Sequence, residues 1–522
     1  MRRTLLVSFI LTGLATTASG QIPATLRLTA DEAVRLALEH NPDLKADRLD
    51  PQISDTRIAV AAGAFKPSFN TNVLHNSQLL PPAGFLTPAP TQNDVVTSGA
   101  GLSQRLPWLG TAYNVSWSAT HTDSNSFLNS YNPQLQSGLS INLSQPLLRD
   151  FFIDTARQQL LTSRTNRDIA DTRLRESVVR MVANVKAAYW NLVAAKGNVE
   201  ARQKALDLAQ ELARVNKAKV DVGQSPPLDL VSAQAEAAAD EEQLIVAQTA
   251  VKQSEDRLRL LILDTTERDA WTVNIEPIDP PPAGIASPDL DAAVANAMRD
   301  RADLVRARKD IENSQTGVTY AGNQRLPDVR VNASYQASGL GGTQVLRSPG
   351  FPGAIVGSGT VTGFGSVLGQ IFGRDYPTWS VGLSVSYPIG QSADEANYVR
   401  ARLETAQARQ RLTSAEARVI QQVRDAGWKI EMNAKRILTT RAARELAEQR
   451  TDAEQKRLDV GLSTSFLVIQ AQRDLAQAKT NELGAILAYD LALVDFESLQ
   501  EAGPAGSAPP VVATSAQSPA RP

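Results

Sequence analysis

The residue types that catalysis and metal binding most often use are sparse in this sequence of 522 residues. Its three histidines, His40, His75 and His121, form no zinc-binding HExxH arrangement, and no GxxxxGK[ST] phosphate-binding loop occurs. The sequence has no cysteine, which excludes disulfides, thiolate metal sites and a cysteine nucleophile. We therefore expect no enzyme, no catalytic residue, no metal site and no cofactor.

Two local patterns could be mistaken for chemical sites. The acidic run Asp240-Glu241-Glu242 is more typical of a solvated helix face than of an acid and base pair. The run Gly339-Leu340-Gly341-Gly342 follows a strand pattern and precedes Pro349 and Pro352. We interpret this glycine-rich run as a flexible loop rather than a nucleotide site.

The first twenty residues have the pattern of a secretory signal peptide. Arg2 and Arg3 precede an apolar run from Leu5 to Leu14, and small residues end the segment at Gly20. We expect cleavage after Gly20; the alternative, a retained membrane anchor, is disfavoured because the apolar run is short. Cleavage would change the formal net charge from −2 to −4, without the basic excess that nucleic-acid binding requires. No nucleic-acid partner is expected.

One pattern occurs twice in the chain. Four groups of residues recur 260 positions later. They are Ala33-Val34, Asp43-Leu44, Pro67 and Asn72, which correspond to Ala293-Val294, Asp303-Leu304, Pro327 and Asn332. At a spacing of 238, Trp190 and Val222-Gly223 recur as Trp428 and Val460-Gly461. A repeat of this kind indicates a duplicated structural unit. The segments we infer are a signal peptide at 1–20, a first copy within 21–264, a linker at 265–287, a second copy at 288–501 and a disordered tail at 502–522.

Each copy contains segments that alternate polar and apolar residues, as two-faced strands do. After Pro67, Ser68 and Asn70 are set against Phe69 and Thr71. Strands of about nine to eleven residues suit a tilted membrane crossing, although a soluble sandwich fits the alternation alone equally well. Aromatic residues within or near these segments suit a barrel at the lipid interface; they are Phe69, Trp117, Tyr335, Tyr376, Trp379 and Tyr387.

Long helices favour the membrane interpretation. No proline occurs between Thr155 and Val222, so we expect one helix about 100 Å long at about 1.5 Å per residue. Its apolar residues from Leu174 to Leu192 recur in steps of four and three, which predicts a coiled-coil seam. The other predicted helices span residues 31–62, 228–262, 290–322, 396–459 and 464–500. A few strands cannot close a barrel alone, so we expect the chain to oligomerise.

Five motifs, taken in their order along the chain, resemble those of the TolC-like family of outer-membrane efflux and secretion channels over residues 27 to 500. They are Leu28-Thr29-Ala30-Asp31-Glu32-Ala33, Asn41-Pro42-Asp43-Leu44, Gln145-Pro146-Leu147-Leu148, Tyr387-Pro388-Ile389 and Arg457-Leu458-Asp459-Val460-Gly461-Leu462-Ser463-Thr464. The resemblance implies a mainly α fold in which long antiparallel coiled-coil helices form a twelve-helix periplasmic α-barrel under a trimeric, twelve-stranded outer-membrane β-barrel. It also implies a homotrimer in outer-membrane lipid that docks to a periplasmic adaptor, which is coupled to an inner-membrane transporter.

The resemblance assigns two sites to the periplasmic end of the helices. It places adaptor docking at the hairpin turns Val222-Gly223-Gln224-Ser225 and Val460-Gly461-Leu462-Ser463-Thr464, where simple turn chemistry is an equally good explanation. The family often closes its entrance with acidic side chains just past the second turn. This sequence has Leu467 and Gln470 there, beside Phe466, so we hypothesise an apolar constriction.

Two questions stay open at this point. Residues 99–106 and 112–121 add alternating segments beyond the family's two strands per copy; they either form a periplasmic hairpin around Pro107-Trp108-Leu109-Gly110 or join the barrel. The main functional alternative is a periplasmic adaptor with a structural coiled coil, which would lack the duplication. A secreted hydrolase is a weaker alternative, because no catalytic constellation is visible. A passive export duct is the expected function.

Overall fold

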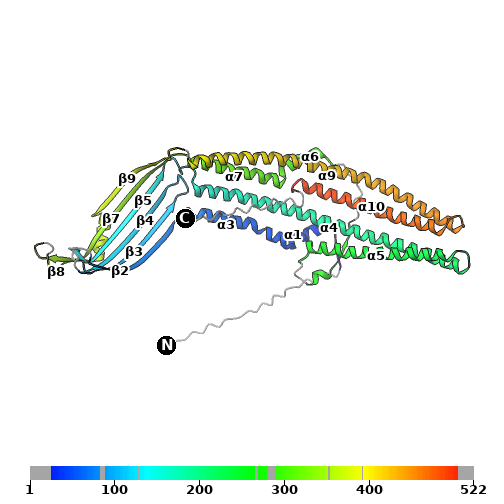
Figure 1. Ribbon diagram of the computed structural model, residues 1–522, viewed down its shortest axis with the longest axis horizontal. Helices are drawn as coiled ribbons and strands as arrows, with labels where there is room; N and C mark the ends of the chain where they lie inside the picture. The colour runs from blue at the N-terminus through cyan, green and yellow to red at the C-terminus, as the bar shows by residue number, and fades with distance from the viewer. Residues whose placement is uncertain are drawn as a thin grey trace, which may run out of the picture. The chain divides into compact units, whose positions relative to one another are not determined.

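The computed structural model describes residues 25–82, 89–126, 129–264, 268–279, 288–350, 353–390 and 392–503 (Figure 1). The expected signal peptide, the Pro280-Pro281-Pro282 run and nearly all of the predicted tail lie outside these residues. The chain divides into two compact units. We call them the helical unit (Met1–Arg48, Leu174–Asp303 and Ala417–Pro522) and the sheet unit (Leu49–Arg173 and Leu304–Glu416). In the described ranges, no helix has both the length and the apolar character needed to span a bilayer.

Four long helices form two hairpins, close to the predicted bounds. Helix α4 (Thr155–Asp221) is followed by α5 (Pro227–Ile262), and α9 (Ala393–Asp459) by α10 (Ser465–Leu499) (Figure 1). Helices α4 and α9 have 67 residues each and contribute to both units. The prediction of two unbroken helices, each followed by a shorter one, is confirmed.

The predicted helices 31–62 and 290–322 are each interrupted. The first consists of α1 (Ala30–His40), α2 (Pro42–Asp47) and α3 (Leu49–Gly63), because Pro42 lacks the N–H that would continue α1. The second consists of α6 (Leu290–Asp300) and α7 (Ala302–Gln324). At its break the extended residue Arg301 buries its side chain, donates to Gln422 Oε1 at 2.6 Å and pairs with Asp303.

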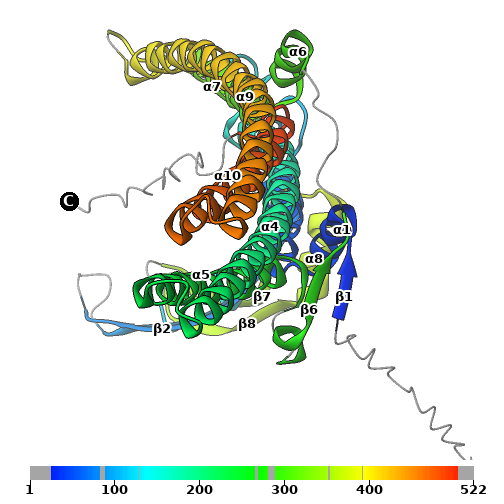
Figure 2. The ribbon, with the colours of Figure 1, turned by 90° about the vertical axis from the view of Figure 1, so that its right-hand side faces the viewer.

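A small parallel sheet anchors the core of the helical unit. Strand β1 (Thr25–Leu28) pairs with β6 (Asn274–Pro277), and Figure 2 shows the two side by side. The 3₁₀ helix η1 (Arg268–Thr272) precedes β6. The Tyr189 hydroxyl donates to the Leu28 carbonyl and accepts from the Asp279 N–H, both at 3.1 Å, and burial raises the pKa of Tyr189 to about 12. Part of the predicted linker at 265–287 is therefore a strand tied to the start of the first copy.

The sheet unit contains one antiparallel sheet. Its strands are β2 (Ser68–Leu80), β3 (Thr91–Arg105), β4 (Ala112–Ser124), β5 (Tyr131–Pro146), β7 (Asp328–Arg347), β8 (Ile355–Thr362) and β9 (Pro377–Ser386). They are ordered β2-β3-β4-β5-β7, and β7 pairs with both β8 and β9. Strand β9 pairs with the first half of β7 and β8 with its second half. Seven strands therefore occupy six positions across the sheet.

The glycine-rich run is part of a strand, so its interpretation as a flexible loop was wrong. Gly339 to Gly342 lie inside β7, where helix α8 (Phe364–Gly373) packs against the strand. A Cβ atom at Gly339 or Gly341 would collide with Val367 of α8, so glycine is required for this close approach. Neither β8 nor β9 pairs with Leu340. Instead, the Leu340 N–H donates to Gln370 Oε1 (2.9 Å), and the Leu340 carbonyl accepts from Gln370 Nε2 (3.1 Å).

Candidate functional site

The register of the sheet separates its side chains into a polar and an apolar face. One row across six strands is polar: Ser68, Ser103, Asn114, Asn142, Ser334 and Ser380. The next row, on the opposite face, is mainly apolar: Phe69, Leu102, Val115, Ile141, Tyr335 and Trp379. The alternation predicted for these segments is therefore confirmed in all six strands.

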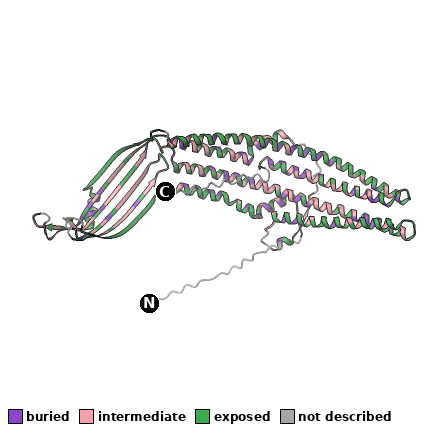
Figure 3. Ribbon diagram, viewed as in Figure 1, coloured by how far each residue is buried: buried purple, intermediate pink, exposed green. Residues whose placement is uncertain are grey.

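The apolar face is exposed in the single chain. Phe69 at one edge of the sheet is 70% exposed, and Trp379 and Leu383 at the other edge are 72% and 64% exposed. Every residue of β2 and β9 is exposed, as Figure 3 shows. A soluble protein buries a face of this kind, so this surface requires an apolar environment that the chain alone does not provide.

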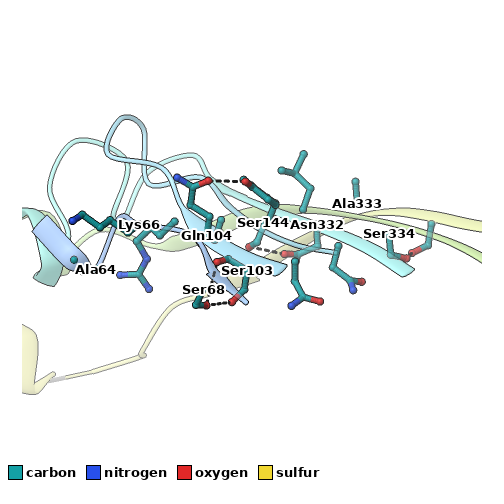
Figure 4. A pocket seen from close by; sticks show the side chains of 17 residues that line it. Ala64, Lys66, Ser68, Ser103, Gln104, Ser144, Asn332, Ala333 and Ser334 are labelled. Atoms are coloured by element: carbon teal, nitrogen blue, oxygen red, sulfur yellow. Dashed lines mark hydrogen bonds between the residues drawn. The ribbon is translucent and has the colours of Figure 1, made fainter. Parts of the chain in front are cut away.

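The polar face is hollowed near the strand ends that adjoin α3. The hollow has a volume of about 770 Å³, and all six residues of the polar row line it (Figure 4). Hydroxyl pairs join neighbouring strands, with 2.7 Å between the Oγ atoms of Ser68 and Ser103 and also of Ser334 and Ser380. Apart from Lys66 and Arg105 the lining residues are uncharged, and most of them are serine, asparagine, alanine or glycine, so this face suits contact with water rather than binding of one ligand.

The first predicted docking turn has the geometry of a helix terminus rather than of a catalytic loop. Helix α4 ends in a Schellman motif, in which the Gln224 N–H donates to the Lys219 carbonyl (2.7 Å) and the Gly223 N–H to the Val220 carbonyl (2.9 Å). Gly223 has φ +76°, which favours glycine. Val222 is 67% exposed, and Ser225 completes the predicted set before α5.

The second predicted docking turn repeats this geometry. The Leu462 N–H donates to the Arg457 carbonyl (2.8 Å), the Gly461 N–H to the Leu458 carbonyl (3.2 Å), and Gly461 has φ +77°. The Thr464 side chain caps α10, whereas the Ser463 hydroxyl donates to Glu454 Oε2 at 2.7 Å. Val460 and Leu462 are 69% and 80% exposed. Both turns therefore present apolar side chains on a rigid backbone.

The two hairpins pack together just behind their turns. A buried cluster combines residues of all four long helices: Leu212, Ala233, Leu458, Val468 and Ile469. The fully buried Asn216 of α4 joins three helices, because its Nδ2 donates to the Asp229 carbonyl (3.2 Å) and its Oδ1 accepts from Ser465 Oγ (3.0 Å). The role of Asn216 could not be predicted, since a polar residue in a long helix carries no pattern of its own.

The predicted constriction residues lie in the first turns of α10. Phe466 and Leu467 are exposed and Gln470 is half-buried, with its Nε2 donating to Asp474 Oδ1 at 3.0 Å. Asp474 also pairs with Arg450 at 2.9 Å, so the carboxylate that Gln470 contacts already has a cationic partner. The described residues include no group of three or more histidine, aspartate or glutamate side chains that could hold a metal ion.

Comparison with known proteins identifies the family. The model of a family described as "Outer membrane efflux protein" matches residues 99–262 and 293–499, segments that fall within the two copies. The chain belongs to the outer membrane efflux protein family. This match decides against the adaptor alternative and confirms the resemblance to TolC-like proteins. The chain therefore functions in efflux at the outer membrane.

Solved structures of low sequence identity share this fold. They include the CmeC outer membrane channel of Campylobacter jejuni (16% identity, TM-score 0.61, 90% of this chain and 85% of that chain). VceC of Vibrio cholerae, an outer membrane protein, matches with 16% identity and a TM-score of 0.62 over 90% of this chain and 96% of that chain. The open state of the Neisseria gonorrhoeae MtrE outer membrane channel matches with 16% identity and a TM-score of 0.59, over 91% and 89%. No curated protein matches the chain significantly.

Proposed function

We propose that three copies of this chain form a passive export duct through the outer membrane. The observation that carries this proposal is the two-faced sheet, whose apolar face is exposed and whose two edges are open. Open edges are not tolerated in lipid, and closing the sheet with further copies satisfies them. The exposed apolar face then contacts lipid acyl chains, and the polar face lines a water-filled interior.

The two helical hairpins of each copy contribute to a periplasmic tunnel in this proposal. Three copies supply the helical wall that the family resemblance implies, and the interior needs no catalytic group because energy enters elsewhere. Substrates are handed over by an inner-membrane transporter through a periplasmic adaptor. The mainly uncharged polar lining of the hollow supports a duct, since a duct passes its cargo without binding it tightly.

The hairpin turns are the proposed adaptor-docking sites. Val222, Val460 and Leu462 expose apolar side chains on turns whose backbones are held by the Schellman motifs. Rigid apolar contacts lose little conformational entropy when a partner covers them, which favours association. The equal geometry of the two turns fits an adaptor that recognises both hairpins in the same way.

The first turns of α10 are the proposed constriction. In a trimer, three copies of Phe466 and Leu467 would converge near the axis, and a narrow apolar ring resists wetting. The position of the acidic ring holds Gln470, and the Asp474 carboxylate that Gln470 contacts is paired with Arg450. The entrance would therefore be closed by dewetting rather than by an acidic ring.

One pair of variants tests docking and constriction separately. Leu467→Asp should raise the conductance of the isolated trimer in a planar bilayer and favour cations, because three carboxylates would wet the ring. Leu462→Asp, at the more exposed leucine in the turn, should leave conductance unchanged and weaken adaptor binding. Unchanged conductance and ion selectivity of Leu467→Asp would contradict the apolar constriction.

A further inference from the structure

The first copy of the repeat contributes four strands to the sheet, whereas two are expected for the family. Strands β3 and β4 lie between β2 and β5. They cover the segments for which the sequence left two alternatives open, a periplasmic hairpin or additional barrel strands. We infer that the outer-membrane barrel of this protein has eighteen strands rather than twelve, and a correspondingly wider lumen. This inference rests on the proposed trimeric duct and specifies its width.

The inserted hairpin is a full part of the sheet. Strand β3 pairs with β2 from Ser68 opposite Ser103 to Leu80 opposite Thr91, without a shift in register. Strand β4 pairs with β3 from Arg105 opposite Ala112 to Asn93 opposite Ser124, again without a shift. A hairpin that only covered the barrel would leave β2 and β5 paired to each other, and they are not paired here.

The hairpin also has the same two faces as the rest of the wall. Val115 and Trp117 lie on the apolar face, and Ser116 and Ser118 lie on the polar face. Gly99 lies opposite Asn72 on the polar face, where a Cβ atom would come within 2.7 Å of Asn72 Oδ1. A plug or a periplasmic hairpin surrounded by water would not need an apolar face that continues the lipid-facing surface of its neighbours.

The turn of the inserted hairpin is fixed at the strand ends nearest the helices of the sheet unit. Gly110 has φ +68°, and its neighbour Leu109 accepts a hydrogen bond from Gln145 Nε2 at 3.0 Å. A Cβ atom at Gly110 would collide with the Asp150 carbonyl, just beyond the end of β5. The turn is thus packed against the place where the wall joins α4, so the hairpin is held within the wall at this end.

The occupant of the open edges is a second copy of the same chain. One edge is β2; the other is formed by β9 and β8, which follow one another along β7 with Gln370 satisfying the backbone between them. Because six positions alternate in direction, β2 and the β8–β9 edge run antiparallel to each other. Neighbouring copies can therefore join antiparallel around the whole barrel. Since β8 and β9 share one position, three copies of six positions make a barrel that is eighteen strands around.

The additional strands change the dimensions of the duct. Barrel diameter grows roughly linearly with strand number, so eighteen strands give about 1.5 times the diameter of twelve. Barrels of about 16 to 18 strands leave an open aqueous channel. The membrane segment would then be wide and lined mainly by uncharged polar side chains and glycine. It would admit cargo of larger cross-section than a twelve-stranded barrel, with selection left to the periplasmic end.

Electron cryomicroscopy of the purified full-length chain in lipid nanodiscs tests this inference by counting the wall strands in axial views. We expect eighteen strands. A matched variant lacking residues 89–126 removes β3 and β4 and joins β2 to β5. Because Ser68, Ser103, Asn114 and Asn142 share one row, this deletion keeps Ser68 and Asn142 on the same face. The variant should form a twelve-stranded barrel with a diameter about one third smaller.

The outcomes separate this inference from the proposed function. A trimeric barrel of twelve strands in the full-length chain, with β3 and β4 outside the wall, would overturn the inference and leave the duct intact. A particle with no closed barrel would overturn both. If the deletion variant does not fold, the strand count of the full-length chain still decides.

Discussion

Replacing Asp490 with asparagine should stabilise the helical unit at pH 8 and change its stability little at pH 4. Asp490 lies in α10, is only 3% exposed, and its Oδ1 has no hydrogen-bond partner. Burial raises the pKa of Asp490 from 3.8 to about 7. The native state therefore holds a proton that the unfolded state releases once the pH exceeds about 4.

The size of the effect follows from this difference in pKa. Between pH 4 and pH 7 the unfolded state binds fewer protons than the native state, so stability falls as pH rises and then levels off above pH 7. The interval between 3.8 and about 7 corresponds to about 4 kcal/mol at about 1.36 kcal/mol per pKa unit. This is an upper estimate for the gain from Asp490→Asn at pH 8, because the amide must also be buried.

Thermal unfolding of the helices, followed by circular dichroism in detergent, measures this gain. The midpoint of Asp490→Asn should exceed that of the unmodified chain at pH 8, and the difference should shrink steadily towards pH 4. Asp495→Asn, at an exposed aspartate of the same helix, serves as the control and should show no such dependence. A gain of equal size at pH 4 and pH 8 would refute the assignment of a protonated, buried Asp490.

Three further predictions concern single contacts. Gly461→Ala should destabilise the second hairpin by about 1–2 kcal/mol because the φ angle of Gly461 is +77°, whereas Gly484→Ala inside α10 should stabilise the hairpin by up to about 1 kcal/mol. Equal thermal unfolding midpoints for the two variants would contradict this. Arg157→Ala should lower the free energy of unfolding by at least about 2 kcal/mol, since the guanidinium donates to the carbonyls of Phe151 (2.7 Å) and Phe152 (2.9 Å). Denaturant unfolding measures this loss, and Arg157→Lys should restore only part of the stability. Gln370→Met should lower the unfolding temperature of the β-structure in lipid by leaving the Leu340 backbone unpaired, and no change would contradict the role given to Gln370.

The long helices and the faces of the strands could be predicted because their signals are local. The proline-free stretch with a coiled-coil seam placed α4 nearly to the residue, the predicted helix 396–459 matches α9 except for three residues at its start, and Gly223 and Gly461 marked the turns. Alternation placed Phe69 and Ser68 on opposite faces. In each case the chemistry of neighbouring residues decides the structure.

Other features depend on contacts between distant segments, which a sequence alone does not reveal. The run from Gly339 to Gly342 has the composition of a loop, and only the approach of α8 makes glycine suitable for a strand there. Strand β6 is four residues long and becomes a strand because β1 lies beside it. The burial of Asn216 and Asp490 likewise depends on how α4, α5 and α10 pack.

The most direct test of the proposed duct is the conductance of the purified chain in a planar lipid bilayer, measured on particles whose mass has first been determined by light scattering. We predict a trimer that inserts and shows small, infrequent openings, as expected for a membrane barrel with a closed periplasmic end. A monomer that gives no conductance would contradict the proposed function.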